Sequence, residues 1–96
     1  MAAFSIMKVT IVMGSTSDKI VAKKTEDMLD ALGISHDTVV ASAHRTPDKV
    51  ESIANGDADV FIAIAGLAAA LPGSLASHTT KPVIGVPVSG KVNFDN

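Results

Sequence analysis

The chain has 96 residues, enough for one small domain, and its formal charge is −2. Because it has no cluster of Lys and Arg and neither Trp nor Tyr, nucleic acid is not an expected partner. The absence of cysteine excludes disulfides, thiolate nucleophiles and cysteine-ligated metal centres. No apolar run approaches the roughly 20 residues of a membrane span, and the first residues lack a signal-peptide pattern. We therefore expect a cytoplasmic protein with no membrane partner.

The first half of the chain predicts two strands with a helix between them. Residues 8–13 (KVTIVM) have the β-branched character of a buried strand, which stops at the polar turn 14–18. A stripe with a 3.6-residue period predicts a following helix whose buried residues would be Val21, Thr25, Met28, Leu29 and Leu32. We expect Gly33 to end this helix in a left-handed conformation. A second strand should follow at about 36–40, and its β-branched residues 38–40 are predicted to be buried.

The second half repeats the alternation of strand and helix. Thr46 and Pro47 predict an N-cap and a first helical residue, and the short helix that follows would bury Val50, Ile53 and Ala54. Further strands are predicted at 59–65 and 82–88, with a helix restarting near Pro72 between them.

This alternation is typical of a parallel α/β sheet with helices on both faces. In such a sheet the loops at the carboxyl ends of the strands share one edge, where ligands bind. Those loops are 14–18, 41–46, 65–73 and 88–90. Since 47% of so short a chain is hydrophobic, we also expect several copies to associate into a homo-oligomer.

The loop 42–47 (SAHRTP) places a proton carrier beside a fixed cation. Histidine exchanges a proton near neutral pH, whereas arginine keeps its charge and matches phosphate oxygens. His44 is therefore a candidate acid/base group and Arg45 a candidate anion ligand. A capped turn with both side chains in solvent explains the same hexapeptide equally well.

The first loop has the residues of an anion site. Gly14 permits close approach of a ligand, Ser15 and Ser17 offer hydroxyl groups, and helix N-terminal amides favour phosphate. Asp18 suits the helix dipole or, alternatively, ribose hydroxyl groups. Plain helix capping is the simpler interpretation of this loop. His36 and His78 are predicted to be surface residues, and no histidine spacing indicates a metal site.

Four motifs in order resemble the family of 5-(carboxyamino)imidazole ribonucleotide mutases, which act in de novo purine synthesis. They are 12–18 (VMGSTSD), 42–47 (SAHRTP), 65–66 (AG) with 71–73 (LPG), and 82–88 (PVIGVPV). The resemblance spans about residues 8–88, so we treat 1–96 as one domain similar to the amino-terminal part of the family's domain. It implies a flavodoxin-like three-layer sandwich with a parallel sheet of about four strands. It also implies an octamer and a cofactor-free shift of a carboxylate from the exocyclic nitrogen to C4 of the imidazole.

The resemblance also assigns roles to particular residues. Ser15, Asp18 and Arg45 match substrate-binding positions, with Arg45 at the phosphate, and His44 matches the general acid/base. A sister branch of the family carboxylates aminoimidazole ribonucleotide with free CO2, and the sequence does not separate the two reactions.

The chain also departs from the family pattern in its third loop. Ile64 and Leu67 stand in place of glycines there, and Ala70 stands in place of a histidine. The family chain is expected to continue past the fourth strand. A truncated, non-catalytic relative that binds a ribonucleotide or another subunit is therefore the alternative.

Overall fold

A computed structural model describes residues 7–66 and 70–88 of the chain. Its sheet has four parallel strands, β1 (Lys8–Met13), β2 (Ser35–Val40), β3 (Val60–Gly66) and β4 (Val83–Val88), in the order β2-β1-β3-β4. The helices are α2 (Lys19–Ala31), preceded by the 3-10 turn η1 (Thr16–Asp18), then α3 (Pro47–Ala54) and α4 (Leu71–Ala76). This order is the first part of the flavodoxin-like order 2-1-3-4-5.

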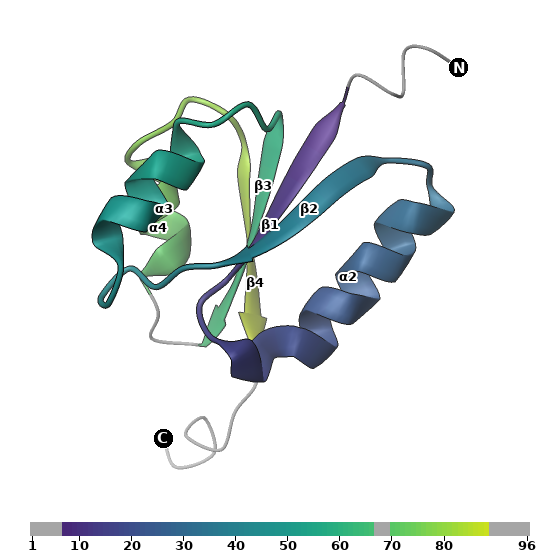
Figure 1. The fold of residues 1–96 in the computed structure, drawn as a ribbon, viewed down its shortest axis with the longest axis horizontal. Coiled ribbons are helices and arrows are strands. Elements are labelled where there is room, and N and C mark those ends of the chain that lie inside the picture. The colour runs from purple at the N-terminus through teal and green to yellow at the C-terminus, as the bar shows by residue number, and fades with distance from the viewer. Residues whose placement is uncertain (1–6, 67–69, 89–96) are drawn as a thin grey trace.

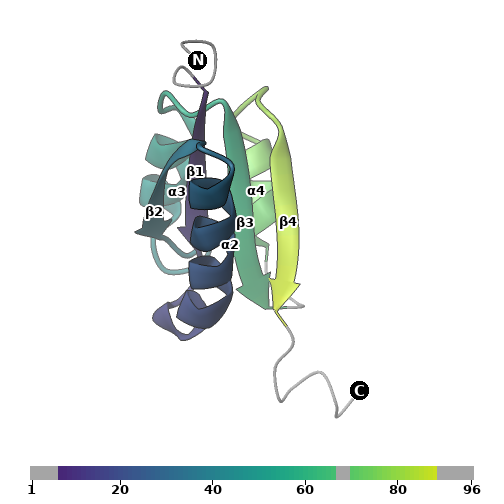
Figure 2. The ribbon, with the colours of Figure 1, turned by 90° about the vertical axis from the view of Figure 1, so that its right-hand side faces the viewer.

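The elements form three layers, as the views in Figures 1 and 2 show. Helix α2 lies on one face of the sheet, and α3 and α4 lie side by side on the other. The predicted flavodoxin-like α/β sandwich is confirmed, and each predicted strand and helix is present within one or two residues of its expected bounds. Within 7–66 and 70–88, no helix has the length and apolar character needed to cross a membrane.

The alternation of side chains along the strands divides the core in two. Val12, Phe61 and Ala63 point to the α3 and α4 side, where Val50 and Leu75 are fully buried. The odd-numbered residues of β1 point to the α2 side, where they pack with helix and strand residues: Val9, Ile11, Met13, Ala22, Leu29 and Ile64. Strand β1 is buried on both faces, as its continuous apolar sequence predicts.

Two glycines have structural roles, of which the sequence predicts the first. Gly33 follows α2 with a φ of +72°, so the predicted left-handed residue at this helix end is confirmed. Gly85, in β4, lies directly beneath α4, where an added Cβ would meet the Pro72 ring at 3.3 Å. The absence of a side chain at Gly85 therefore lets α4 approach the sheet closely.

Three predictions for the elements are wrong in detail. Met28 and Leu32 were predicted to be buried, but each is 61% exposed, because no described element covers that flank of α2. The segment around Val39 is only half-buried because β2 is an edge strand. His36 was predicted to lie on the surface, but its side chain is only 16% exposed and its Nε2 bonds to Asp30 Oδ1 at 2.7 Å.

Candidate active site

The turn after β1 caps η1 with its own serine. The Ser15 hydroxyl oxygen accepts the Ser17 amide hydrogen at 3.0 Å, and the Ser15 carbonyl accepts that of Asp18 at 3.1 Å. The hydroxyl groups of Ser15 and Ser17 also form a hydrogen bond with each other. The amide hydrogens of Ser17 and Asp18, which could otherwise bind an anion, are therefore already hydrogen-bonded to Ser15. Helix capping is confirmed as one role of this loop.

Asp18 differs from the rest of this loop because its side chain is buried. The residue is 8% exposed, and neither of its carboxylate oxygens is among the described buried polar atoms that lack a hydrogen-bond partner. Its place in the first loop is compatible with a ligand whose hydroxyl groups donate hydrogen bonds to the carboxylate. The dipole of α2 also favours a carboxylate here, so the position alone does not separate the two predicted roles of Asp18.

The loop after β2 is held by side-chain hydrogen bonds to its own backbone. The Ser42 hydroxyl oxygen accepts the amide hydrogens of His44 and Arg45, at 3.2 and 3.1 Å. The Thr46 hydroxyl accepts the Ser42 amide hydrogen at 2.9 Å and donates to the Ser42 carbonyl. Thr46 occupies the N-cap position of α3 as predicted, but its side chain makes no capping bond because it is engaged with Ser42.

These two loops enclose one cavity of about 420 Å³ at the carboxyl edge of the sheet. Its lining includes the serine turn and two cations that follow β2, Arg45 in the second loop and Lys49 in the first turn of α3. The full lining is Gly14, Ser15, Thr16, Ser17, Val40, Ala41, Ser42, Arg45, Thr46 and Lys49. Two predicted site residues, Ser15 and Arg45, are therefore brought to one cavity although 30 positions separate them in the sequence.

The other two predicted site residues lie next to this lining but not in it. Asp18 directly follows Ser17, and His44 directly precedes Arg45 and is exposed. Sequence reasoning missed Lys49, whose signal was its spacing of four residues from Arg45 across the start of α3. The structure thus brings together two residues that were predicted to bind an anion or substrate, and leaves the predicted acid/base group beside them.

The third loop lies partly outside the described residues. Leu67, one of the departures from the family pattern, falls in the range 67–69, and Ala70 is exposed. Ile64 lies within β3 and is fully buried on the α2 side, so it is a core residue and not a loop residue. Its carbonyl accepts the Gly14 amide hydrogen at 3.0 Å, which ties the first loop to β3.

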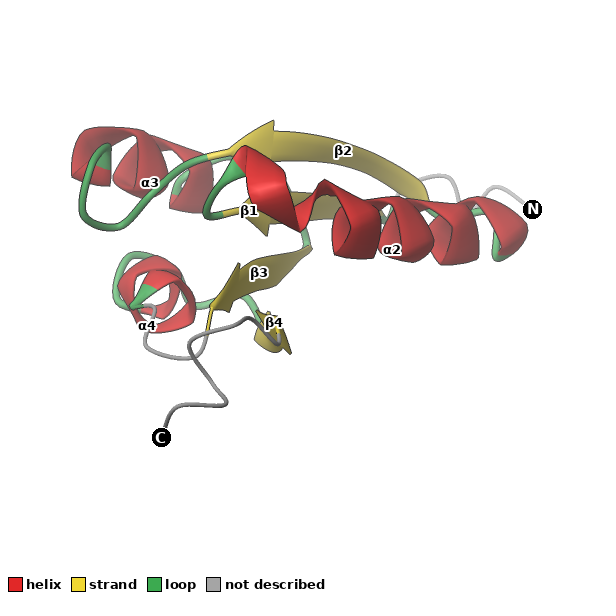
Figure 3. Cartoon of the chain, turned by 90° about the horizontal axis from the view of Figure 1, so that it is seen from below, coloured by secondary structure: helices red, strands yellow, loops and turns green. Residues whose placement is uncertain are grey.

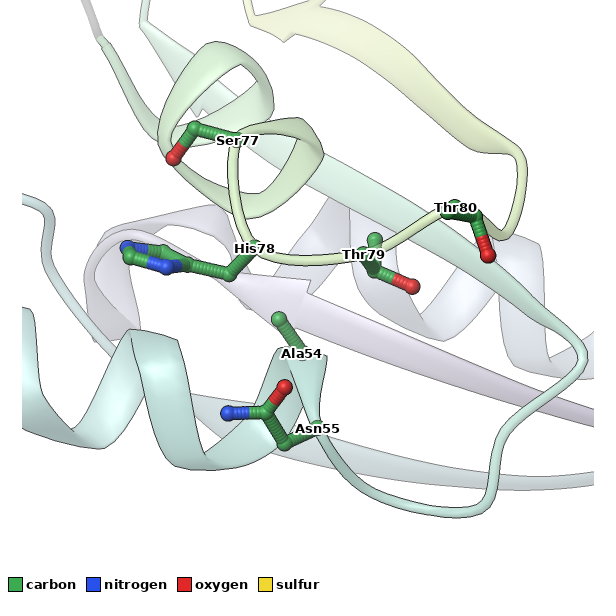
Figure 4. Close-up of a pocket in the computed structure, with 6 residues that line it drawn as sticks. All are labelled: Ala54, Asn55, Ser77, His78, Thr79 and Thr80. Atoms are coloured by element: carbon green, nitrogen blue, oxygen red, sulfur yellow. The ribbon is translucent and has the colours of Figure 1, made fainter.

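A second cavity, of about 500 Å³, lies at the opposite edge of the sheet. Figure 4 shows its lining where α3 and α4 end: Ala54, Asn55, Ser77, His78, Thr79 and Thr80. None of the predicted site residues is among them, and His78 is exposed, as predicted.

The amino-terminal edge also carries the exposed ion pair of Lys8 Nζ with Asp57 Oδ1, at 3.1 Å. The hydrogen bond that Lys8 Nζ donates to the Asp57 carboxylate raises the pKa of Lys8 and lowers the pKa of Asp57.

The family assignment follows from comparison with known proteins. The family model of AIR carboxylase matches residues 8–95. The chain belongs to the AIR carboxylase family. It is 57% identical over 86 residues to the N5-carboxyaminoimidazole ribonucleotide mutase of Methanocaldococcus jannaschii, and 48% identical over 89 residues to that of Vibrio parahaemolyticus.

Each of these matches covers 88% of this chain and 55% of the relative, so the chain spans about half the length of these mutases. Among solved structures, PurE of Treponema denticola matches with a TM-score of 0.81 and 30% identity, over 90% of this chain and 58% of that one. Among the described residues there is no group of three or more His, Asp or Glu side chains that could hold a metal ion.

Proposed function

We propose that the chain carries the ribonucleotide site of an N5-carboxyaminoimidazole ribonucleotide mutase of de novo purine biosynthesis. The observation that supports this proposal best is the shared cavity of Ser15, Arg45 and Lys49 at the carboxyl edge of the sheet. The names of the relatives support the same activity. A cytoplasmic location and the assembly of several copies remain predictions within this proposal.

The cavity's cations define the position of the substrate phosphate. Arg45 binds two phosphate oxygens with its planar guanidinium group, and Lys49 adds a second positive charge one helical turn away. The Ser15 hydroxyl completes the phosphate site, and the buried Asp18 carboxylate accepts hydrogen bonds from the ribose hydroxyl groups. The phosphate thus fixes one end of the ligand, and the imidazole lies toward His44.

His44 moves the one proton that the reaction needs. As the bond between the exocyclic nitrogen and the carboxylate breaks, the imidazolium of His44 donates a proton to that nitrogen and CO2 is released. C4 of the ring then attacks CO2, and the neutral imidazole of His44 removes the C4 proton, which restores the starting state. Because His44 is exposed in a loop held by Ser42, it can reach a ligand that the cavity holds by its phosphate.

A second candidate function is ribonucleotide binding without turnover. It is favoured by one observation, that His44 does not line the cavity. The two functions agree on the binding residues and differ only in whether His44 acts on the ligand. Within the first, carboxylation by dissolved CO2 is a variant that uses the same residues.

The test is an assay of the full chain with each substrate, the carboxyamino ribonucleotide and aminoimidazole ribonucleotide with CO2. We expect product from one of them, and we expect His44→Asn to abolish turnover while ribonucleotide affinity changes less than about threefold. The matched control is His78→Asn, which replaces an exposed histidine at the opposite edge. It should change neither turnover nor ribonucleotide affinity. Unchanged turnover in His44→Asn would exclude the acid/base role, and binding without turnover in the wild type would favour the second candidate.

A further inference from the structure

The loop between β2 and α3 is closed by the side chain of Thr46. Figure 3 draws this loop in green, where the chain leaves β2 and enters α3. The Thr46 hydroxyl oxygen accepts the Ser42 amide hydrogen at 2.9 Å, and the same hydroxyl group donates to the Ser42 carbonyl oxygen at 3.2 Å. The Thr46 amide also donates to that carbonyl oxygen, at 2.9 Å. We call these three hydrogen bonds between Ser42 and Thr46 the loop clamp.

The loop clamp is anchored to the body of the fold at both ends. The Ala41 amide donates to the Met13 carbonyl oxygen at 2.9 Å, which ties the residue before Ser42 to β1. The Thr46 carbonyl oxygen accepts the Val50 amide hydrogen at 3.1 Å, at the start of α3. Because Ala41 and Val50 are both buried, the two ends of the loop are fixed by the core.

Ser42 in turn holds the backbone of the two candidate site residues of this loop. Its hydroxyl oxygen accepts the amide hydrogens of His44 and Arg45. Both residues are exposed, so core packing contributes little to their conformation. The direction in which Arg45 enters the cavity therefore depends on the Ser42 hydroxyl group, and the position of Ser42 depends on Thr46.

The stability of α3 does not explain this role of Thr46. A threonine at an N-cap usually accepts an amide hydrogen from the second or third helical residue, which stabilises the helix. The Thr46 side chain makes no such bond, because its hydroxyl group is engaged with Ser42. The hydroxyl group of Thr46 therefore stabilises the loop that carries the site residues and not the helix that follows it.

We propose that Thr46 is a positioning residue, which acts through Ser42 to hold Arg45 in the cavity before a ribonucleotide binds. This inference rests on the proposed function, since it takes Arg45 as the phosphate ligand. Without the loop clamp, residues 43–45 occupy several conformations, and only molecules with Arg45 in the cavity bind the ligand. The apparent Kd then rises in inverse proportion to the fraction of those molecules.

The test compares Thr46→Val with the wild type in the full chain. Valine keeps the branched shape of threonine and removes both hydrogen bonds of the hydroxyl group. In calorimetric titrations with aminoimidazole ribonucleotide, Kd should rise about tenfold, the order of effect expected for two lost hydrogen bonds. In the turnover assay KM should rise by a similar factor. We expect kcat to change less than about threefold, because the bound phosphate restores the loop that carries His44.

Two further variants separate positioning from a general effect of losing a threonine. Thr46→Ser, which keeps the hydroxyl group, should return Kd and KM to within about threefold of the wild-type values. Thr79→Val is the matched control at the opposite edge, where the Thr79 hydroxyl oxygen accepts the Lys81 amide hydrogen at 3.0 Å. This control also loses a loop hydrogen bond between a threonine and the backbone, and it should bind the ribonucleotide normally.

Thermal melts and a double variant test how Thr46 acts. The melting temperature of Thr46→Val should fall by less than about 4 °C, because the residue is exposed and makes no capping bond. A purely structural role would instead lower kcat with the amount of folded protein and leave KM unchanged. If Thr46 acts through Ser42, the affinity losses of Ser42→Ala and Thr46→Val should not multiply in the double variant.

The outcomes distinguish this inference from the proposed function. A Kd of Thr46→Val equal to that of the wild type would overturn the positioning role and leave the proposed function standing. A raised Kd that Thr46→Ser does not reverse, or losses that multiply in the double variant, would also overturn it. A wild-type chain that does not bind the ribonucleotide would overturn the proposed function and the positioning role together.

Discussion

Replacing Arg45 by methionine removes one of the two cations in the cavity while keeping a side chain of similar length. A phosphate carries a charge of about −1.5 to −2 at neutral pH, and unit charges 4 Å apart interact by about 1 kcal/mol in a water-like dielectric. Because Arg45 is exposed, the water-like value applies, and the loss should be about 1–2 kcal/mol. Ribonucleotide affinity is therefore expected to fall about 5- to 30-fold.

The assay is isothermal titration calorimetry with aminoimidazole ribonucleotide at two salt concentrations. Lys49→Met should lower affinity about fivefold, since a lysine does not bind two oxygens at once. Lys81→Met is the control, because it makes the same change of net charge at the opposite edge, where Lys81 Nζ donates to the Ala58 carbonyl. At 0.1 M salt the screening length is about 10 Å, so this variant should bind normally. Equal affinities of Arg45→Met and the wild type would refute the phosphate assignment.

Three further predictions concern the fold. Gly33→Ala should destabilise the chain by about 1 kcal/mol, lowering Tm by about 4–8 °C in a calorimetric scan, because its φ of +72° disfavours a side chain. An unchanged Tm would contradict this backbone geometry. Leu75→Ala, at a fully buried position of α4, should cost about 2–5 kcal/mol in urea unfolding, and a cost below 1 kcal/mol would count against this core. The lowered pKa of Asp57 stabilises the fold above pH 4, and this contribution is lost as the pH falls through the folded-state pKa. The stability deficit of Lys8→Met should therefore shrink between pH 5 and pH 2, and a constant deficit would argue against the pair with Asp57.

The sequence predicts the alternation of elements well because local chemistry determines it. The β-branched run of β1 is buried on both faces, and Gly33 takes the backbone conformation that its position after the helix requires. The parallel arrangement follows from the alternation, and the common edge of the loops follows from the parallel arrangement. These steps need no knowledge of which side chains touch.

The errors arise where a prediction depends on what lies opposite a residue. The period of α2 identifies Met28 and Leu32 as apolar, but it does not tell whether a described element covers them. The position of His36 beside Asp30 depends on how α2 lies against β2, which no local pattern gives. Similarly, Thr46 has two possible partners at a helix start, and the turn geometry selects Ser42 over the helix amides.

The sequence predicts which edge of the sheet carries the candidate site, but it does not predict which side chains line the cavity there. Ser15 and Arg45 meet in the cavity because both follow neighbouring strands, β1 and β2. Adjacent residues of one loop point in different directions, so the motif alone did not indicate that Arg45 lines the cavity while His44 does not. Lys49 was missed because a lysine in a first helical turn is usually a solvent-exposed residue.

The most direct test of the account is an NMR titration of the isotope-labelled chain with aminoimidazole ribonucleotide. The account predicts saturable shifts of the backbone amides of residues 14–18 and 42–49, with residues 77–80 at the opposite edge unchanged. Shifts confined to residues 54–55 and 77–80, which line the second cavity, would contradict the central claim that the carboxyl edge binds the ribonucleotide, as would the absence of any saturable shift.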